Sequence, residues 1–297
     1  MPNFVIIKKK INKFNKNLLI DGDKSLSIRW ALLSSQSHKK CKSSNLLLSE
    51  DVISTLDCLK KLGVKIRVSK KFCEINGLGL NGFKYKDNLI LDAGNSGTLG
   101  RLVLGLLVHS KKKIELKGDK SLSKRDFLRV INPLEKFGAK FKSNYGKLPI
   151  QIQGTNYSKA IRYNENKGSA QCKSAVMFAA LNTYGETIIK AKKSRDHSEL
   201  LFKHLGLPIK VIKMKKYDII KIKGKNKIPA LNYKIPSDIS SAAFFIVLTA
   251  LAKNSKLEIK NININPSRMG VFYILKLMGV KISKFNTRNY KGEKIAD

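Results

Sequence analysis

The chain has 297 residues, of which 42% are hydrophobic, and its 59 Lys and Arg against 21 Asp and Glu give a formal net charge of +38. This length is enough for two domains with buried cores. A charge of this size is typical of nucleic-acid-binding proteins. The lysines are nevertheless scattered along the whole chain and form no patch with interleaved aromatic residues, so the composition favours anionic small substrates over nucleic acid.

Cysteine and histidine spacing argues against a metal site and a disulfide framework. The four cysteines show no C-x-x-C pair, and the four histidines show no H-E-x-x-H motif. The first residues lack the order of a signal peptide, and the longest apolar stretch, 242–252, is too short to span a bilayer. We therefore expect a cytoplasmic protein with reduced cysteines, no metal and no membrane partner.

An eight-residue motif occurs twice. Residues 22–29 read GDKSLSIR and residues 118–125 read GDKSLSKR. One interpretation is a pair of ordinary helix starts capped by a polar side chain, with solvated cations nearby. The other is a site for phosphate or carboxylate, because a helix start offers N–H groups and the motif adds Lys, hydroxyls and Arg. The repetition favours a functional or duplicated element.

A longer repeat runs through the chain. A helical segment that ends in Gly, followed by a short strand, recurs about every seventy residues, at Gly63, Gly138, Gly206 and Gly279. Each Gly is expected to adopt the left-handed conformation that ends a helix. The alternative is a generic α/β protein in which these helix ends coincide by chance.

Each of these helices is preceded by another that begins with small polar residues and then becomes apolar. The polar starts lie at 25–27, 95–98, 168–171 and 237–241, and the apolar bodies at 30–33, 102–108, 175–181 and 242–252. Helices this apolar are expected to be buried. The sequence therefore predicts four copies of a helix, strand, helix, strand unit, with helix starts that converge on a cleft and bind anions.

Six motifs in this order resemble one known family. They are residues 22–25 with Arg29, LDAGNSGT at 91–98 with Arg101, SLSKR at 121–125, SAQ at 169–171 with 173–174, SRDHSE at 194–199, and NPSR at 265–268 followed by Met278 and Gly279. Together they resemble the 5-enolpyruvylshikimate-3-phosphate (EPSP) synthases, which are 3-phosphoshikimate 1-carboxyvinyltransferases. The resemblance covers nearly the whole chain.

The resemblance implies an α/β fold of two similar domains, each built from three βαβαββ units, with the substrates between them. Residues 21–236 would form one complete three-unit domain, and residues 1–20 with 237–297 a partial second domain. The chain stops at Asp297, inside the family pattern, so we expect it to be C-terminally truncated. The apolar helix at 242–252 would then lack much of its cover and expose hydrophobic surface.

The implied reaction belongs to the shikimate pathway, which leads to chorismate and the aromatic amino acids. It transfers the carboxyvinyl group of phosphoenolpyruvate to the 5-hydroxyl of shikimate 3-phosphate and releases phosphate, without a cofactor. Because the expected truncation removes further site residues, we expect the chain alone to be weakly active or inactive. We expect a monomer, or a chain complemented by a separate C-terminal fragment.

The resemblance also implies roles for individual residues. Lys24 would be the catalytic residue, as a candidate for proton transfer that touches both substrates. Shikimate 3-phosphate would be bound by Lys24, Ser25, Arg29, Ser169, Ala170, Gln171 and Arg195. Phosphoenolpyruvate would be bound by Lys24, Asn95, Gly97, Arg125 and Gln171.

Two other functions stay open at this point. A UDP-N-acetylglucosamine enolpyruvyl transferase would share the fold, but it usually has a loop cysteine, and residues 118–125 contain none. A basic RNA-binding protein, or a relative of the RNA-terminal phosphate cyclases, would share the repeat unit. Salt-sensitive RNA binding without affinity for shikimate 3-phosphate would favour this last alternative.

Overall fold

The computed structural model describes residues 6, 11, 13–69 and 72–297. The chain divides into a larger unit, Gly22–Ile235, and a smaller unit, Met1–Asp21 with Pro236–Asp297. The larger unit begins and ends one residue inside the boundaries expected from the sequence. Residues 1–5, 7–10 and 12, which were assigned to the partial domain, lie outside the described residues.

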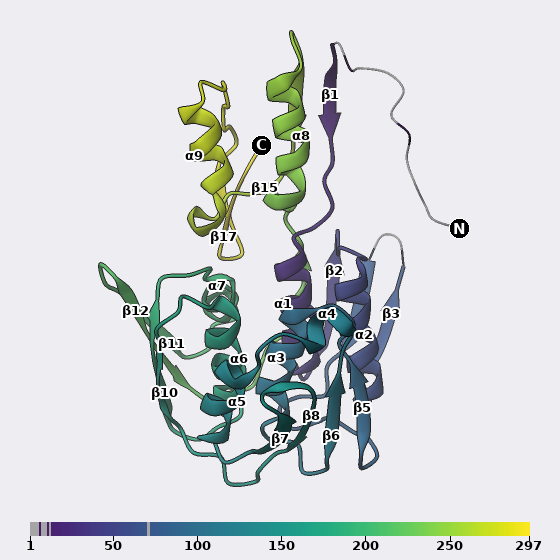
Figure 1. Ribbon diagram of the computed structural model, residues 1–297, viewed down its shortest axis with the longest axis vertical. Coiled ribbons are helices and arrows are strands. Elements are labelled where there is room, and N and C mark those ends of the chain that lie inside the picture. The colour runs from purple at the N-terminus through teal and green to yellow at the C-terminus, as the bar shows by residue number, and fades with distance from the viewer. Residues whose placement is uncertain (1–5, 7–10, 12, 70–71) are drawn as a thin grey trace. The chain divides into compact units, whose positions relative to one another are not determined.

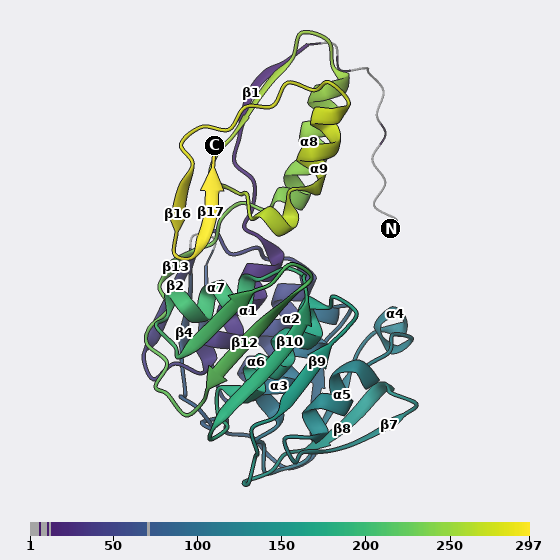
Figure 2. The same cartoon turned by 90° about the vertical axis from the view of Figure 1, so that its left-hand side faces the viewer.

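The larger unit contains three sheets of four strands each with the same strand pattern. In each sheet a parallel pair is followed by an antiparallel hairpin. Figure 2 shows β9, β10 and β12 of the third sheet side by side. The first sheet has the strand order β13 (Tyr233–Lys234), β2 (Lys40–Ser44), β4 (Phe72–Asn76) and β3 (Lys65–Val68). The second has the order β5 (Leu89–Asp92), β6 (Ile114–Lys117), β8 (Lys147–Gln153) and β7 (Lys140–Asn144). The third has the order β9 (Arg162–Glu165), β10 (Glu186–Lys192), β12 (Tyr217–Lys223) and β11 (Ile209–Lys213).

Three helices of the larger unit are buried almost completely. They are α1 (Lys24–Ser35), α3 (Gly97–Leu107) and α6 (Ala170–Ala180), and they run between the sheets (Figure 1). Three further helices bury only one face, as amphipathic helices do: α2 (Glu50–Lys61), α5 (Leu128–Glu135) and α7 (His197–His204). The larger unit also contains a single helical turn, α4 (Lys120–Ser123). The predicted mixed α/β fold with repeated buried helices is therefore confirmed.

Glycine ends the second helix of every repeat. Gly63, Gly138, Gly206 and Gly279 have φ angles of 89°, 105°, 65° and 84°. A side chain at such a positive φ would be strained. The predicted helix ends are confirmed at all four positions.

The smaller unit contains a fourth pair of helices, α8 (Ile239–Leu251) and α9 (Gly270–Leu277), both labelled in Figure 1. Its strands are β1 (Asn15–Leu18) parallel to β14 (Lys256–Ile259), and a sheet of β15 (Ile262–Asn263), β17 (Glu293–Ala296) and β16 (Arg288–Tyr290). Its core includes Ile20, Ala242 and Phe272.

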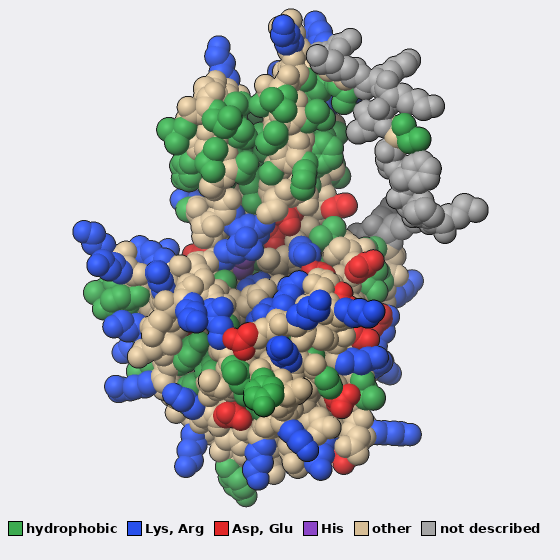
Figure 3. All heavy atoms as spheres, viewed as in Figure 1, with side chains coloured by type: hydrophobic (Ala, Val, Ile, Leu, Met, Phe, Trp, Pro, Cys, Tyr) green, Lys and Arg blue, Asp and Glu red, His purple; other side chains and the backbone are tan. Residues whose placement is uncertain are grey.

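The two helices of the smaller unit carry an exposed apolar face. Phe244 and Leu251 on α8 are 80% and 79% exposed, and Leu277 on α9 is 89% exposed. Figure 3 shows hydrophobic side chains gathered over these two helices. The exposure expected for the apolar helix is therefore confirmed. In the described part of the chain, no helix combines the length and the apolar character that crossing a membrane requires.

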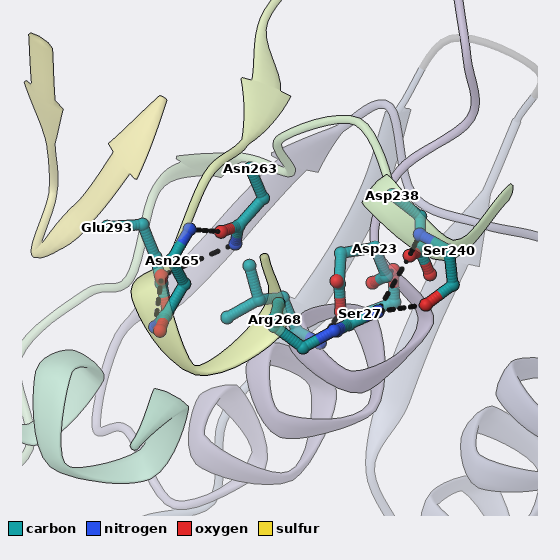
Figure 4. A network of polar contacts seen from close by, with 9 residues as sticks. Asp23, Ser27, Asp238, Ser240, Asn263, Asn265, Arg268 and Glu293 are labelled. Carbon is teal, nitrogen blue, oxygen red and sulfur yellow. Dashed lines mark hydrogen bonds and ion pairs between the residues drawn. The ribbon is translucent and has the colours of Figure 1, made fainter. Parts of the chain in front are cut away.

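A polar network holds the turn before α9 against the start of α8 (Figure 4). The Arg268 guanidinium donates to Asp238 Oδ1 at 2.9 Å and to the Ser240 hydroxyl at 2.6 Å. The fully buried Glu293 accepts hydrogen bonds from the side-chain amides of Asn263 and Asn265. These contacts satisfy polar groups that burial would otherwise penalise.

The contact between α3 and α6 depends on Gly105. A Cβ atom at this position would lie 2.1 Å from the carbonyl oxygen of Ala175 in α6. Only glycine allows the two helix backbones to come this close. One turn further along the chain, His109 Nε2 lies 3.1 Å from the carbonyl oxygen of Ala179, so the close contact continues.

We expect Gly105→Ala to destabilise the larger unit by about 1–3 kcal/mol, because the added methyl group must push α3 away from α6. Gly270→Ala is the matched control, since its Cβ meets nothing within 4 Å and Ala is the better helix former. Thermal unfolding followed by circular dichroism measures both variants. Equal melting temperatures for the two variants would contradict the proposed close contact.

Candidate functional site

The predicted site residues gather around the first turns of the three buried helices. Each helix is capped by a side chain that accepts a hydrogen bond from a backbone N–H: Asp23 from Leu26 at 2.9 Å, Ser96 from Leu99 at 3.2 Å, and Ser169 from Cys172 at 3.2 Å. None of the three first turns contains an acidic residue. The remaining N–H groups and the positive end of each helix dipole therefore favour an anion.

The repeated octapeptide forms the same cap in both copies. Asp119 in the second copy accepts a hydrogen bond from the backbone N–H of Leu122 at 2.6 Å, as Asp23 does in the first. The first copy opens the buried helix α1, whereas the second forms only the single turn α4. The hydrogen bonds from Leu122 and from Asn95 hold the pKa of Asp119 below its usual value.

A cluster of polar groups lies at the start of α3. Arg101 Nη1 donates to Gln171 Oε1 at 2.9 Å and to the Gly97 carbonyl oxygen at 3.1 Å. Gln171 Nε2 donates in turn to the Thr98 hydroxyl at 3.0 Å. The structure thus joins Gly97 of α3 to Gln171 of α6, seventy-four positions apart in the sequence.

Arg125 completes this cluster from the second octapeptide. Its Nη2 donates to Asn95 Oδ1 at 3.2 Å, and Asn95 Nδ2 donates to Asp119 Oδ2 at 2.5 Å. A Cβ atom on Gly97 would lie 2.8 Å from Arg101 Nη1 and 2.9 Å from Arg125 Nη1. Two guanidinium groups therefore approach the backbone at the start of α3, and a Cβ atom at Gly97 would displace them.

The Arg101 guanidinium stacks on an aromatic ring. Its Cζ atom lies 4.8 Å from the centre of the Phe127 ring, a cation–π geometry. Partial burial lowers the pKa of Arg101, and the nearby positive charges of Arg125 and Arg129 lower it further. Arginine stays protonated under these conditions, so the cluster concentrates positive charge beside the helix start.

Arg29 joins α1 to α6 and α7. Its side chain is 3% exposed, and it donates from Nε to the Ser198 hydroxyl at 2.8 Å and from Nη2 to the Ser174 hydroxyl at 3.2 Å. It also donates from Nη1 to the Ser25 carbonyl oxygen at 3.1 Å. The two serine hydroxyls are 2.7 Å apart. The second turns of α1 and α6 are thereby joined to each other.

A buried ion pair lies next to this network. Lys173 Nζ is 2.6 Å from Glu199 Oε1, and the two side chains are 1% and 4% exposed. Burial raises the pKa of Glu199, and the Lys173 ammonium partly counters this shift. The Lys173–Glu199 pair therefore links α6 to α7. Lys173 follows Cys172, and Glu199 follows Ser198.

The other predicted residues lie at the edges of this arrangement. Lys24 Nζ is 2.7 Å from Asp51 Oδ2 of α2, and its side chain is 47% exposed. Ala170 is the first residue of α6. Arg195 is exposed on the loop before α7, three positions ahead of Ser198. The structure thus brings Asn95, Gly97, Arg125 and Gln171 together. Arg29, which also bonds to the Ser25 carbonyl oxygen, reaches α6 at Ser174.

Sequence reasoning assigned no role to Arg101, Ser174 or the Lys173–Glu199 pair. The sequence did contain a signal for this ion pair. Lys173 lies in a helix that is expected to be buried, and a buried lysine needs a buried partner of opposite charge. Arg101 lies four residues after Gly97, on the same helix face. No group of three or more His, Cys, Asp or Glu residues suited to a metal ion occurs among the residues that the structure describes.

Comparison with known proteins identifies the family of this chain. The sequence model of EPSP synthase (3-phosphoshikimate 1-carboxyvinyltransferase) matches residues 8–294. The chain belongs to the EPSP synthase family. A 3-phosphoshikimate 1-carboxyvinyltransferase of Ruthia magnifica is 44% identical over 100% of this chain and 67% of its own length. One from Thermoanaerobacter sp. is 40% identical over 98% of this chain and 67% of its own length.

The solved EPSP synthase structure from Acinetobacter baumannii superposes with a TM-score of 0.86 at 35% sequence identity. The match covers 96% of this chain and 64% of the solved one. The chain therefore spans about two thirds of the length of the EPSP synthases that it matches.

We expect Lys173→Met to destabilise the larger unit by about 3–5 kcal/mol, because it leaves the Glu199 carboxylate buried without its cation. The double variant Lys173→Met with Glu199→Leu should recover much of this loss, since both charges are then gone. Lys60→Met is the matched control: Lys60 pairs with Asp57 at 3.0 Å on an exposed helix face, and its loss should cost under about 1 kcal/mol. Urea unfolding measures the stability of all three variants. If Lys173→Met lost no more stability than Lys60→Met, the expectation would be refuted.

Proposed function

We propose that the chain binds shikimate 3-phosphate and phosphoenolpyruvate at the first turns of α1, α3 and α6. In this proposal it forms the matching part of an EPSP synthase, with Gly22–Ile235 as the complete three-unit βαβαββ domain and the smaller unit as part of a second. The observation that carries the proposal is the convergence of three capped helix starts with Arg101 and Arg125. Membership of the EPSP synthase family supports the proposed reaction.

The contacts at the starts of α1 and α6 support a shikimate 3-phosphate site. Ser169 and Ala170 offer the helix start to the phosphate, and Arg195 on the adjoining loop adds positive charge. Ser25 and Arg29 position the cyclohexene part, with Arg29 fixed by Ser174 and Ser198. Gln171 reaches both substrates from the first turn of α6.

The contacts at the start of α3 support a phosphoenolpyruvate site. Asn95 holds Arg125 in place, and Gly97 leaves the helix start open to the anion. The positive charge of the two arginines matches a substrate that carries a phosphate and a carboxylate. No metal or organic cofactor is part of this proposal.

Lys24 is proposed to transfer a proton during the reaction and to contact both substrates. It lies at the first position of α1, and its ion pair with Asp51 orients the ammonium group. The reaction also needs water to be excluded and the attacking hydroxyl to be deprotonated. Because this chain spans about two thirds of its relatives, we propose that it binds substrates but turns them over slowly or not at all by itself.

Lys24→Met should weaken shikimate 3-phosphate binding roughly 10- to 100-fold, because it removes a charge-assisted contact worth about 1.5–3 kcal/mol. The chain supplies its own control, since Lys120 stands at the same place in the second octapeptide. Lys120→Met should bind the ligand as the unchanged chain does. Isothermal titration calorimetry measures the affinity of both variants for shikimate 3-phosphate. An equal loss of affinity in the two variants would show a general charge effect.

Salt-sensitive RNA binding without any response to shikimate 3-phosphate would favour the RNA-binding alternative.

Gly97→Ala should weaken phosphoenolpyruvate binding and leave shikimate 3-phosphate binding nearly unchanged. The added Cβ would displace the guanidinium groups of Arg101 and Arg125, which lie under 3 Å from its position. Displacing one such charge-assisted contact costs about 1.5–3 kcal/mol. Calorimetric titration with phosphoenolpyruvate, in the presence of saturating shikimate 3-phosphate, measures the effect. An equal loss for both ligands would contradict separate sites.

A further inference from the structure

A cavity of the larger unit lies at the opposite end of α1 and α3 from their first turns. Its volume is about 440 Å³, which is within the range of small-molecule sites. Gln36, the residue after α1, and Leu106, in the last turn of α3, are among its lining residues. Because the 11 residues of α3 separate it from Gly97, the cavity is not part of the proposed phosphoenolpyruvate site.

One wall of this cavity comes from the loop between β4 and β5, residues 77–88. The corresponding loops after β8 and β12 span residues 154–161 and 224–232. All three loops begin with a glycine, and a Cβ atom there would lie within 2.4 Å of a carbonyl oxygen near the end of a buried helix. The first loop is the longest, and its middle residues, Asn81 and 83–85, line the cavity. Loops that extend a repeated scaffold in this way often carry binding sites.

Hydrogen bonds hold this loop at several points. Leu78 N–H donates to the last carbonyl oxygen of α1, and Lys84 N–H donates to the carbonyl oxygen of Leu62, just after α2, both at 2.9 Å. From the segment after α3, Lys112 Nζ donates to the Tyr85 carbonyl oxygen at 3.0 Å. The cavity is therefore formed before a ligand enters, and a preformed site loses less free energy to ordering on binding.

The exposed part of the cavity lining is basic. Lys84, Lys111 and Lys112 belong to it, and no Asp or Glu is among the lining residues. Within the described part of the chain, the ammonium groups of Lys84 and Lys111 form no ion pair. Positive charges gathered around one cavity without acidic partners attract an anionic group.

The buried part of the cavity lining offers a hydrogen-bond acceptor. His109 is 6% exposed, and its Nε2 lies 3.1 Å from the Ala179 carbonyl oxygen, so Nε2 carries the proton of the neutral ring. Burial lowers the pKa of His109 to about 4, so the ring is neutral near pH 7. Its Nδ1 is then an acceptor, and it has no hydrogen-bond partner among the residues that the structure describes.

The apolar part of the lining includes Phe83, Leu106 and the ring of Tyr85. We propose that the cavity binds a small aromatic acid that also carries a hydroxyl group. The aromatic ring packs against the apolar side chains, and the acidic group pairs with Lys84 and Lys111. The hydroxyl group donates a hydrogen bond to His109 Nδ1. This ligand is additional to the two substrates of the proposed function.

The test is isothermal titration calorimetry of the 297-residue chain with 4-hydroxybenzoate as the probe. Three related probes each lack one feature: acetate lacks the ring, 4-hydroxybenzyl alcohol lacks the acidic group, and benzoate lacks the hydroxyl group. We expect acetate and the alcohol to bind at least about tenfold more weakly than 4-hydroxybenzoate. Benzoate should bind about 3- to 10-fold more weakly, which corresponds to the loss of one hydrogen bond.

The double variant Lys84→Met with Lys111→Met should weaken binding of 4-hydroxybenzoate at least about tenfold. Both side chains are exposed, so the fold does not depend on them. Lys140→Met with Lys210→Met is the matched control, because it removes the same charge from exposed positions on the edge strands β7 and β11. This control should bind the probe as the unchanged chain does.

The imidazole nitrogens report on the buried end of the cavity. The chain has four histidines, so their nitrogen resonances can be resolved by nuclear magnetic resonance. At saturation the Nδ1 resonance of His109 should shift more with 4-hydroxybenzoate than with benzoate, because only the first probe has a hydroxyl group to donate. Equal shifts would contradict a hydrogen bond to Nδ1.

Four further results would overturn the proposal. They are the absence of binding, equal affinities for 4-hydroxybenzoate and 4-hydroxybenzyl alcohol, equal losses in the two double variants, and displacement of the probe by phosphoenolpyruvate. The last result would place the probe in the proposed substrate site. Binding of the probe does not require substrates to bind, so this proposal and the proposed function can fail independently.

Discussion

The close approach of α3 to α6 at Gly105 is the constraint on which the site depends. It sets the distance between two helix axes, and the first turns of these helices carry Gly97 and Gln171. At this distance Arg101 on α3 reaches the Gln171 side chain on α6 at 2.9 Å. A backbone contact deep in the core thus determines which polar groups meet at the helix starts.

Buried polar groups then fix the rotation of the helices. Apolar packing alone tolerates small rotations, because apolar contacts are not directional. The hydrogen bonds of Arg29 to two serines and the Lys173–Glu199 ion pair are directional, and breaking one leaves an unsatisfied buried group. We interpret these contacts as the means by which α1, α6 and α7 keep one arrangement, at some cost in desolvation.

Local features of the fold could be predicted from the sequence because their causes are local. The glycines that end helices must take a positive φ whatever surrounds them. The starts of α1, α3 and α6 follow from polar residues that precede an apolar run. The repeated octapeptide identified both caps, although it did not show that one copy opens a long buried helix and the other a single turn.

The features that could not be predicted depend on partners far along the chain. Arg101 and Gln171 lie seventy positions apart, and nothing in either segment predicts that their side chains form a hydrogen bond. The exposure of α8 was expected from the family resemblance and not from its own residues, because its apolar pattern is like that of α3 and α6. In the larger unit such helices are enclosed by three sheets, whereas on α8 only Ile239 and Ala242 are buried. An apolar run thus determines that a helix needs cover, and the number of repeats around it determines whether it is covered.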